Sequence, residues 1–142
     1  MAEHKIEAVV IDSGTTLLYF TGISWWPSER TFVAIIPAKG GIKYVCPAFE
    51  EDRFRELLKI GNEVYVWQED ESPYQLIATV LKDAGIRTGK IGVEERLRFF
   101  VFNGMKQEAA HLEYVSADPV TAQCRLIKSP AEIALMQKAA DI

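Results

Sequence analysis

The chain has 142 residues, 49% of them hydrophobic, and a formal net charge of −4 from 16 basic and 20 acidic residues. This length can bury one hydrophobic core, so a single compact domain is expected. The basic residues are scattered, which argues against binding nucleic acid or an anionic membrane surface. No apolar run approaches the roughly 18 residues that span a bilayer. The start, MAEHKIEAVVID, lacks the pattern of a signal peptide, so we expect a cytoplasmic protein.

The first third of the chain is predicted to be mostly sheet. Residues 7–13 form a short β-branched apolar run, typical of a buried strand. Residues 30–47 contain two strand-like runs separated by AKGG, whose glycines suit the loop of a hairpin. Residues 48–61 change to helical spacing with Gly61 as the stop, and residues 63–68 predict another strand.

The second half alternates between helix and strand. A helix is predicted over residues 72–86, with Ser72 as its cap and Pro73 in its first turn. A strand follows at residues 89–94, then a helix at 96–111 interrupted by Asn103-Gly104, a strand at 113–118 and a connecting segment at 118–127. The alternation implies parallel pairing beside the antiparallel hairpin. We therefore predict an α/β domain with a mixed sheet flanked by helices.

A last helix begins at Ser129. Ser129 and Glu132 have the spacing of a capping box, and Ile133, Met136 and Ala140 fall on one face. No glycine, proline or polar cluster follows to end this helix. We expect a domain boundary at residues 128–130 and interpret the chain as the front part of a larger enzyme.

No residue of the chain is a convincing catalytic group or metal ligand. The two histidines, His4 and His111, have no partner at ligand spacing. The GxSxG, GxGxxG and GxxxxGK[ST] motifs are absent. Cys46 and Cys124 show no CxxC spacing, so we expect reduced structural thiols, although Cys46 beside Pro47 is also a conceivable nucleophile.

Aromatic residues mark two candidate contact surfaces. The segment YFTGISWWPSERTF places Trp25 and Trp26 near Arg30 in a loop, a composition typical of a contact surface or a site rim. The simpler interpretation is that the two indoles cover the end of the sheet. Trp67 ends a predicted strand before the acidic loop QEDESP, where an indole can close a pocket or merely cap the core.

Four segments, in order, resemble the N-terminal domain of the creatinase, prolidase and aminopeptidase P group. They are LLYFTG, SERTFVAIIPAKGGIKYVCPAFEEDR, VWQEDESPYQ and CRLIKSPAEIALMQKAADI. The resemblance covers nearly the whole chain, although only MAEHK stands where family members usually begin with an additional helix. It implies a ribonuclease H-like three-layer domain at residues 1–128. Residues 129–142 would then begin the first helix leading into a C-terminal catalytic domain.

The resemblance also implies a function. In this group the "pita-bread" catalytic domain binds two divalent metals, often manganese or cobalt, through Asp, His and Glu ligands, and its peptidases hydrolyse the bond before proline. Those ligands lie downstream of residue 142, so this segment alone would be catalytically silent. The expected partners are its own C-terminal catalytic domain, a second subunit in a homodimer, and short Xaa-Pro peptides as substrate.

By the same resemblance, the N-terminal domain of one subunit approaches the active site of another and restricts it to short peptides. Trp67 is the first candidate to line that entrance, followed by Trp25, Trp26 and Arg30. Two other functions remain open. One is a creatinase-type amidinohydrolase, and the other is a free-standing interaction or ligand-binding module in which the SWWPSER loop is itself the site.

Overall fold

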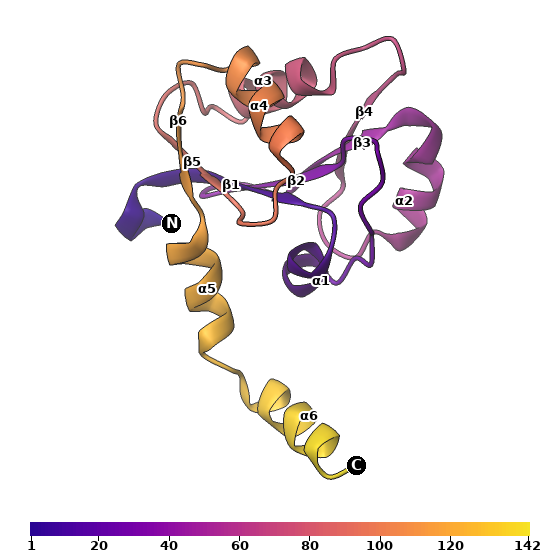
Figure 1. Ribbon diagram of the computed structural model, residues 1–142, viewed down its shortest axis with the longest axis vertical. Coiled ribbons are helices and arrows are strands. Elements are labelled where there is room, and N and C mark those ends of the chain that lie inside the picture. Colours follow the sequence, from indigo (N-terminus) through magenta and orange to yellow (C-terminus); the bar gives the residue numbers. More distant parts are fainter.

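The computed structural model describes residues 1–142 and contains a six-stranded sheet with helices on both faces (Figure 1). The elements follow in the order η1 (Ala2–His4), β1 (Ile6–Asp12), α1 (Thr15–Thr21), β2 (Val33–Pro37), β3 (Lys43–Pro47), η2 (Ala48–Glu50), α2 (Glu51–Leu57), β4 (Glu63–Trp67), α3 (Pro73–Asp83), β5 (Lys90–Val93), α4 (Phe99–Glu108), β6 (Glu113–Ser116), α5 (Asp118–Leu126) and α6 (Pro130–Ala140).

The sheet is mixed, with the strand order β4-β3-β2-β1-β5-β6. The predicted hairpin is confirmed, since β2 pairs antiparallel with both β1 and β3. The pairs β1–β5, β5–β6 and β3–β4 are parallel. Every strand except β2 therefore runs in one direction, and the carboxyl ends of these strands meet at a single edge of the sheet.

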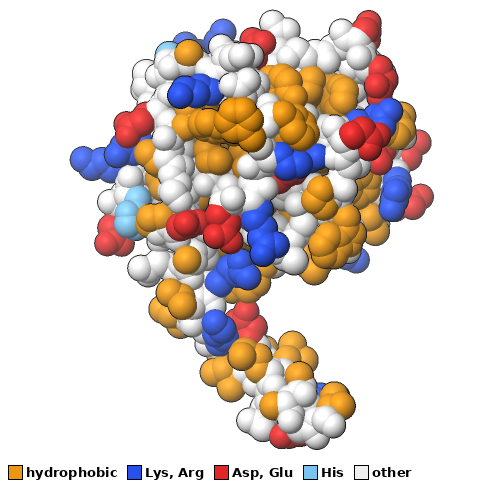
Figure 2. Space-filling model, in the orientation of Figure 1, with side chains coloured by type: hydrophobic (Ala, Val, Ile, Leu, Met, Phe, Trp, Pro, Cys, Tyr) orange, Lys and Arg blue, Asp and Glu red, His pale blue; other side chains and the backbone are white.

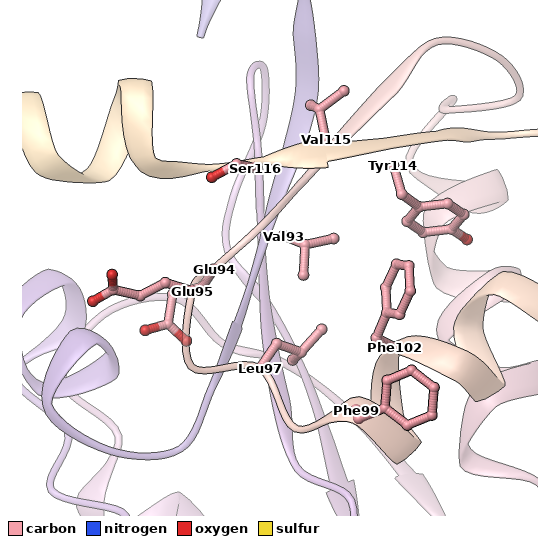
Figure 3. Close-up of a pocket in the computed structure, with 9 residues that line it drawn as sticks. All are labelled: Val93, Glu94, Glu95, Leu97, Phe99, Phe102, Tyr114, Val115 and Ser116. Atoms are coloured by element: carbon pink, nitrogen blue, oxygen red, sulfur yellow. The ribbon is translucent and has the colours of Figure 1, made fainter.

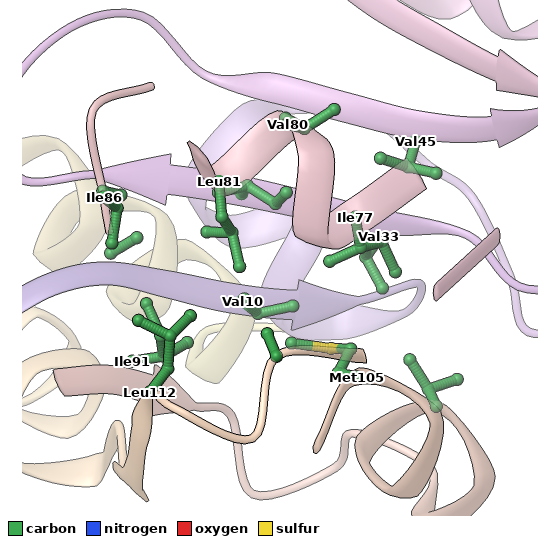
Figure 4. Close-up of a cluster of buried hydrophobic side chains, with 14 of the residues drawn as sticks. Val10, Val33, Val45, Ile77, Val80, Leu81, Ile86, Ile91, Met105 and Leu112 are labelled. Atoms are coloured by element: carbon green, nitrogen blue, oxygen red, sulfur yellow. The ribbon is translucent and has the colours of Figure 1, made fainter. Parts of the chain in front are cut away.

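One hydrophobic core lies on each face of the sheet, between the strands and the helices that cover them. The domain therefore has three layers, as expected for an α/β fold. On one face, α3 and α4 cover strand residues such as Val10 and Val33 with the buried side chains of Ile77 and Met105 (Figure 4). On the other face, α1, α2 and α5 cover the sheet, with Phe54 of α2 fully buried. Ser72 caps α3 as predicted, because its hydroxyl accepts the backbone N–H of Gln75 at 3.3 Å.

Three local predictions need correction. Residues 118–127 are not merely connecting: Asp118 and Pro119 suit a first helical turn, and α5 covers the sheet through its buried Thr121. Helix α4 runs without interruption through Asn103-Gly104. The helix expected over residues 48–61 is shorter, because α2 ends at Leu57.

An additional short helix, α1, precedes the tryptophan segment. It ends at Gly22, whose positive φ of 70° closes the helix in the left-handed conformation that glycine adopts readily. The motif YFTG thus marks a helix end. The loop that contains the two tryptophans therefore begins directly after α1.

Helix α6 lies away from the sheet, at the end of α5 (Figure 1). The predicted capping box is present, since the Ser129 hydroxyl accepts the Glu132 N–H and the Glu132 carboxylate accepts the Ser129 N–H. No residue of α6 is buried, and Ile133 and Met136 are 57% and 59% exposed. Hydrophobic side chains accordingly gather on the projecting segment in Figure 2. None of the helices combines the length and apolar character needed to cross a membrane.

Candidate functional site

The tryptophan loop, defined here as residues 22–32, crosses the edge of the sheet where the carboxyl ends of the parallel strands meet. It leaves α1 at Gly22 and enters β2 at Val33, which is paired with Asp12 at the end of β1. Open α/β sheets place their binding sites at this edge. The loop contains three of the four residues that the sequence identifies as candidates for a substrate entrance.

Trp25 anchors the first half of the tryptophan loop in the core. Its ring lies 5.6 Å from that of Phe32 and 5.5 Å from that of Phe54, in the second case edge to face. Its backbone carbonyl accepts the N–H of Gly14 at 2.8 Å. The side chain is only 6% exposed, so Trp25 covers the end of the sheet, as the simpler interpretation held.

Trp67 anchors the last part of the loop. The indole Nε1 donates a hydrogen bond of 3.0 Å to the backbone carbonyl of Thr31, two residues before β2. The side chain is 7% exposed and belongs to the core between the sheet and α3–α4. Its position at the entrance of an active site stays a prediction, but in this domain the ring faces the core and its one polar atom is already paired.

Arg98, which the sequence analysis did not single out, forms a third anchor from outside the loop. Its guanidinium is bidentate to the Asp12 carboxylate, with Nε–Oδ2 at 2.7 Å and Nη2–Oδ1 at 3.0 Å. Asp12 is 2% exposed, and the N–H of Ser13 also donates to it at 2.7 Å. A buried carboxylate needs this degree of pairing to remain charged.

The other donors of Arg98 reach the backbone of the tryptophan loop. Nη1 donates to the carbonyl of Ser28 and Nη2 to the carbonyl of Arg30, the latter at 3.2 Å. The guanidinium also lies over the ring of Phe100, 4.9 Å from its centroid. One side chain therefore joins the end of β1, the start of α4 and the loop, which only the fork geometry of arginine permits.

Trp26 and Arg30 are the candidates that face outward. Trp26 is 62% exposed, although Trp25 before it is buried and the Ser28 carbonyl after it is bonded by Arg98. The Arg30 guanidinium lies 4.5 Å from the Phe49 ring centroid and pairs with Glu29 and with Glu69, the latter at 2.9 Å. These contacts orient the guanidinium at the surface beside the acidic loop that follows Trp67.

A buried carboxyl group lies near the anchoring pair. Glu94 follows β5 and is 3% exposed, and its Oε1 accepts the Thr16 hydroxyl at 2.8 Å. Burial raises the pKa of Glu94, and the nearby charge of Asp12 raises it further. Two buried carboxyl groups therefore lie at this edge of the sheet. Asp12 is paired with the Arg98 cation, whereas Glu94 accepts a hydrogen bond from the neutral Thr16 hydroxyl.

A cavity of about 410 Å³ opens beside α4 at the carboxyl ends of β5 and β6. The rings of Phe99, Phe102 and Tyr114 stand on one side of it, and the carboxylates of Glu94 and Glu95 lie on the other (Figure 3). Small-molecule sites span about 300–1,000 Å³, so the cavity has the size of a small binding site. Val93, Leu97, Val115 and Ser116 complete its lining.

The remaining candidate groups are possible metal ligands and the two cysteines. No group of three or more His, Cys, Asp or Glu side chains is placed to hold a metal ion, so the residues present do not fit a metal centre. Cys46 and Cys124 are unpaired thiols. Burial raises the pKa of Cys46 to about 12, and its thiol donates to the Pro47 carbonyl, which favours the interpretation of Cys46 as a structural thiol.

Comparison with known proteins identifies relatives of the chain. The family model described as Creatinase/Prolidase N-terminal domain matches residues 1–127. Ectoine hydrolase of Halomonas elongata is 33% identical over an alignment covering 100% of this chain and 38% of its own length. The uncharacterized peptidase C18A7.01 of Schizosaccharomyces pombe is 30% identical, with coverage of 97% and 32%. The chain thus spans about a third of the length of these curated relatives.

Solved structures agree with the fold. The prolidase of Thermococcus sibiricus superposes with a TM-score of 0.84 at 26% identity, covering 99% of this chain and 38% of the prolidase. The N-terminal domain of Xaa-Pro dipeptidase from Lactobacillus brevis superposes with a TM-score of 0.74 at 17% identity, covering 86% of this chain and 92% of that domain. The second match supports the fold alone.

Proposed function

Because the chain belongs to the creatinase/prolidase N-terminal domain family, we propose that it is the non-catalytic N-terminal domain of a cytoplasmic, metal-dependent Xaa-Pro peptidase. In this proposal residues 1–128 form the domain, and residues 129–142 begin the connection to a C-terminal catalytic domain. The chain's span of about a third of its relatives supports a further domain in the parent protein. Two divalent metals, manganese or cobalt, belong to that second domain and supply the nucleophile there.

The specific role that we propose for this domain is to assemble a homodimer and to narrow the entrance to the partner's active site. The observation that carries this proposal is the exposed Trp26 indole on a loop that is otherwise fixed. Trp25, Trp67 and Arg98 hold the backbone of the tryptophan loop, whereas Trp26 projects without a partner ring. A rigid aromatic at the surface presents a large contact area at little entropic cost.

The four predicted entrance residues then divide into two roles. Trp26 and Arg30 face outward and meet the substrate or the partner subunit. Trp25 and Trp67 do not meet the substrate in this proposal, and they support the entrance by holding the two ends of the loop. The aromatic entrance that the sequence assigned first to Trp67 is therefore reassigned in our proposal to Trp26, with Trp67 as its support.

The test uses the complete protein that contains this domain, loaded with Mn²⁺ or Co²⁺. We expect Trp26→Ala to widen the entrance. The ratio of kcat/KM for an Ala-Pro-containing tetrapeptide to that for the Ala-Pro dipeptide should then rise roughly tenfold, the scale on which one apolar contact discriminates between substrates. Trp26→Phe keeps an aromatic ring and should restore most of the length preference. Ile60→Ala removes an exposed apolar side chain outside both the loop and the cavity and serves as control.

An unchanged ratio in a correctly folded Trp26→Ala enzyme would refute the gating role. Sedimentation of the complete protein provides the separate test of the dimer, because a monomer would remove the partner active site that the loop is proposed to approach. Gating can therefore fail in an intact dimer, whereas a monomer would refute both the assembly and the gating of a partner's active site.

The similarity to ectoine hydrolase favours a second candidate function, a creatinase-type amidinohydrolase or a related hydrolase of a non-peptide C–N bond. A panel of Xaa-Pro dipeptides, creatine and ectoine, assayed with the same metals, separates the two. Hydrolysis of the dipeptides alone supports the peptidase, and hydrolysis of creatine or ectoine alone supports the second candidate.

A further inference from the structure

We propose that Arg98 is a positioning residue that holds the tryptophan loop from outside and thereby sets the geometry of the entrance without touching substrate. The inference rests on the proposed gating function for its consequence, but its structural part stands on the contacts of Arg98 alone. Arg98 is the only side chain outside the loop that forms hydrogen bonds with the backbone of residues 26–30.

The first support is the way in which the loop is fixed along its length. Its beginning is fixed by the Gly14–Trp25 backbone hydrogen bond and its end by the Trp67–Thr31 hydrogen bond. Between these two points lie residues 26–30, where the backbone carbonyls of Ser28 and Arg30 are bonded by Arg98. The backbone of the segment that carries Trp26 and Arg30 is thus held by one side chain from outside the loop, in addition to the contacts that the Arg30 side chain makes with Glu69 and Phe49.

The second support is that Arg98 is itself immobilised. Its bidentate contact to the buried Asp12 uses Nε and one hydrogen of Nη2, and its Cζ lies over the Phe100 ring, 4.9 Å from the centroid. The side chain is 22% exposed. A guanidinium held on one side by a buried anion presents its remaining N–H groups in fixed directions, which is what positioning of a neighbouring backbone requires.

The contact also reaches across the fold. Asp12 and Arg98 are 86 residues apart in sequence, and Arg98 precedes the first residue of α4, next to the cavity lined by Phe99. A displacement of the start of α4 is therefore transmitted directly to the loop through one rigid group. Lysine could satisfy Asp12 with its charge, but its single nitrogen could not reach the carboxylate and both loop carbonyls in this geometry.

The experiment compares Arg98→Lys with the wild type in the complete protein, using two readouts. The first is hydrogen exchange of the backbone amides. We expect exchange in residues 26–31 to accelerate roughly tenfold, an opening cost equivalent to about 1.4 kcal/mol, with β1 and α3 unchanged. The second is steady-state kinetics. We expect KM for the Ala-Pro dipeptide to rise several-fold while kcat changes less than twofold.

Two further variants make the outcome specific. Arg96→Lys is the matched control, since Arg96 is exposed and makes only a 4.0 Å contact to Glu95, so neither readout should change. In the double variant Arg98→Lys/Trp26→Ala, the two effects on KM should add to less than their sum, because part of the Arg98 effect passes through Trp26. If Arg98→Lys does not fold, Phe100→Leu answers the same question, since it removes only the ring against the guanidinium and should accelerate loop exchange about twofold.

Unchanged loop exchange in a folded Arg98→Lys protein would overturn the positioning role. KM effects of Arg98 and Trp26 that add fully would also overturn it, because they would show that Arg98 acts by another route. Faster loop exchange with no kinetic effect of either Arg98→Lys or Trp26→Ala would support the positioning of the loop by Arg98 and would refute the proposed gate. The two proposals therefore fail in distinguishable ways.

Discussion

Gly104 of α4 packs directly against the ring of Tyr74 at the start of α3. A Cβ atom at position 104 would lie 2.4 Å from Cγ of Tyr74, closer than any real carbon contact. Overpacking costs about 1–3 kcal/mol, and a Cβ this close to the ring places the substitution Gly104→Ala at the upper end of that range. After the roughly 0.8–1.0 kcal/mol that alanine gains over glycine in a helix is subtracted, the free energy of unfolding should fall by about 2 kcal/mol. Urea denaturation of residues 1–142 measures the difference.

The neighbouring Asn103→Ala is the control for this substitution, because Asn103 is exposed on the same helix. It should change the unfolding free energy by no more than about 0.5 kcal/mol, as surface substitutions generally do. If Gly104→Ala proves as stable as Asn103→Ala, α3 and α4 do not pack as closely as the structure shows.

Trp67→Phe tests the support of the tryptophan loop. The substitution leaves the Thr31 carbonyl without its indole donor inside the core. An unsatisfied buried acceptor costs about 1–3 kcal/mol, and we expect the free energy of unfolding to fall by this amount. Trp26→Phe, at the exposed position in the same loop, should leave it within about 0.5 kcal/mol. Equal stability of the two variants would show that the Trp67 indole does not hold the loop.

The elements that could be predicted from sequence are those whose signals are local. Ser72 and Ser129 begin helices because each caps its own first turn, and the glycines of AKGG lie in the hairpin that β2 and β3 form. Gly104 was misinterpreted for a physical reason. Glycine lowers helix propensity, but here it is required by the ring of Tyr74, which is 30 residues away and invisible to a local pattern.

The candidate site shows the same limit. The sequence alone does not show which of the two adjacent tryptophans is buried. Trp25 is the buried one because its ring packs against Phe32 and Phe54. Arg98 lies in RLRFF with no local signal of its importance, and its partner Asp12 is only the last residue of an apolar strand. An acidic residue at the end of a buried strand is only a weak indication that a cationic side chain from a distant part of the sequence pairs with it.

Glu94 should make stability depend on pH. Its pKa is raised in the folded chain by burial and by Asp12, so the folded state keeps the proton at pH values where the unfolded chain has released it. This contribution to stability is complete below the unfolded pKa of about 4.3 and is lost as the pH rises through the folded pKa. Glu94→Gln keeps an acceptor for Thr16 and removes the titration.

The measurement for Glu94 is the difference in unfolding free energy between Glu94→Gln and the wild type, followed upward from about pH 4. The difference should shift in favour of the variant as the pH rises and then level off. Lowered pKa values at Glu63 and Glu132 act in the opposite direction but cancel in this comparison, since both proteins contain these residues. A difference that does not depend on pH would show that Glu94 is not buried as described.

The two cysteines should differ sharply in reactivity. Cys124 is exposed on α5, whereas Cys46 is buried with a pKa of about 12. At about pH 8, iodoacetamide should modify Cys124 rapidly and Cys46 only after denaturant is added, because the thiolate is the reacting form. Intact mass and peptide mapping identify the site, and Cys124→Ser should abolish the fast phase. Rapid modification of Cys46 in folded Cys124→Ser would place that thiol at the surface.

Helix α6 should cause residues 1–142 to self-associate when produced alone. Its apolar residues Ile133 and Met136 are more than half exposed and line an open hollow with Leu126 at the end of α5. Exposed apolar patches of this kind associate in water. Light scattering should show an average mass that rises with concentration, and Ile133→Glu/Met136→Glu should suppress the rise. Lys138→Glu changes the net charge by the same two units without removing an apolar residue, so it should leave association nearly unchanged. If Lys138→Glu suppresses association as strongly as the double variant, charge repulsion and not the apolar surface of α6 controls the oligomeric state.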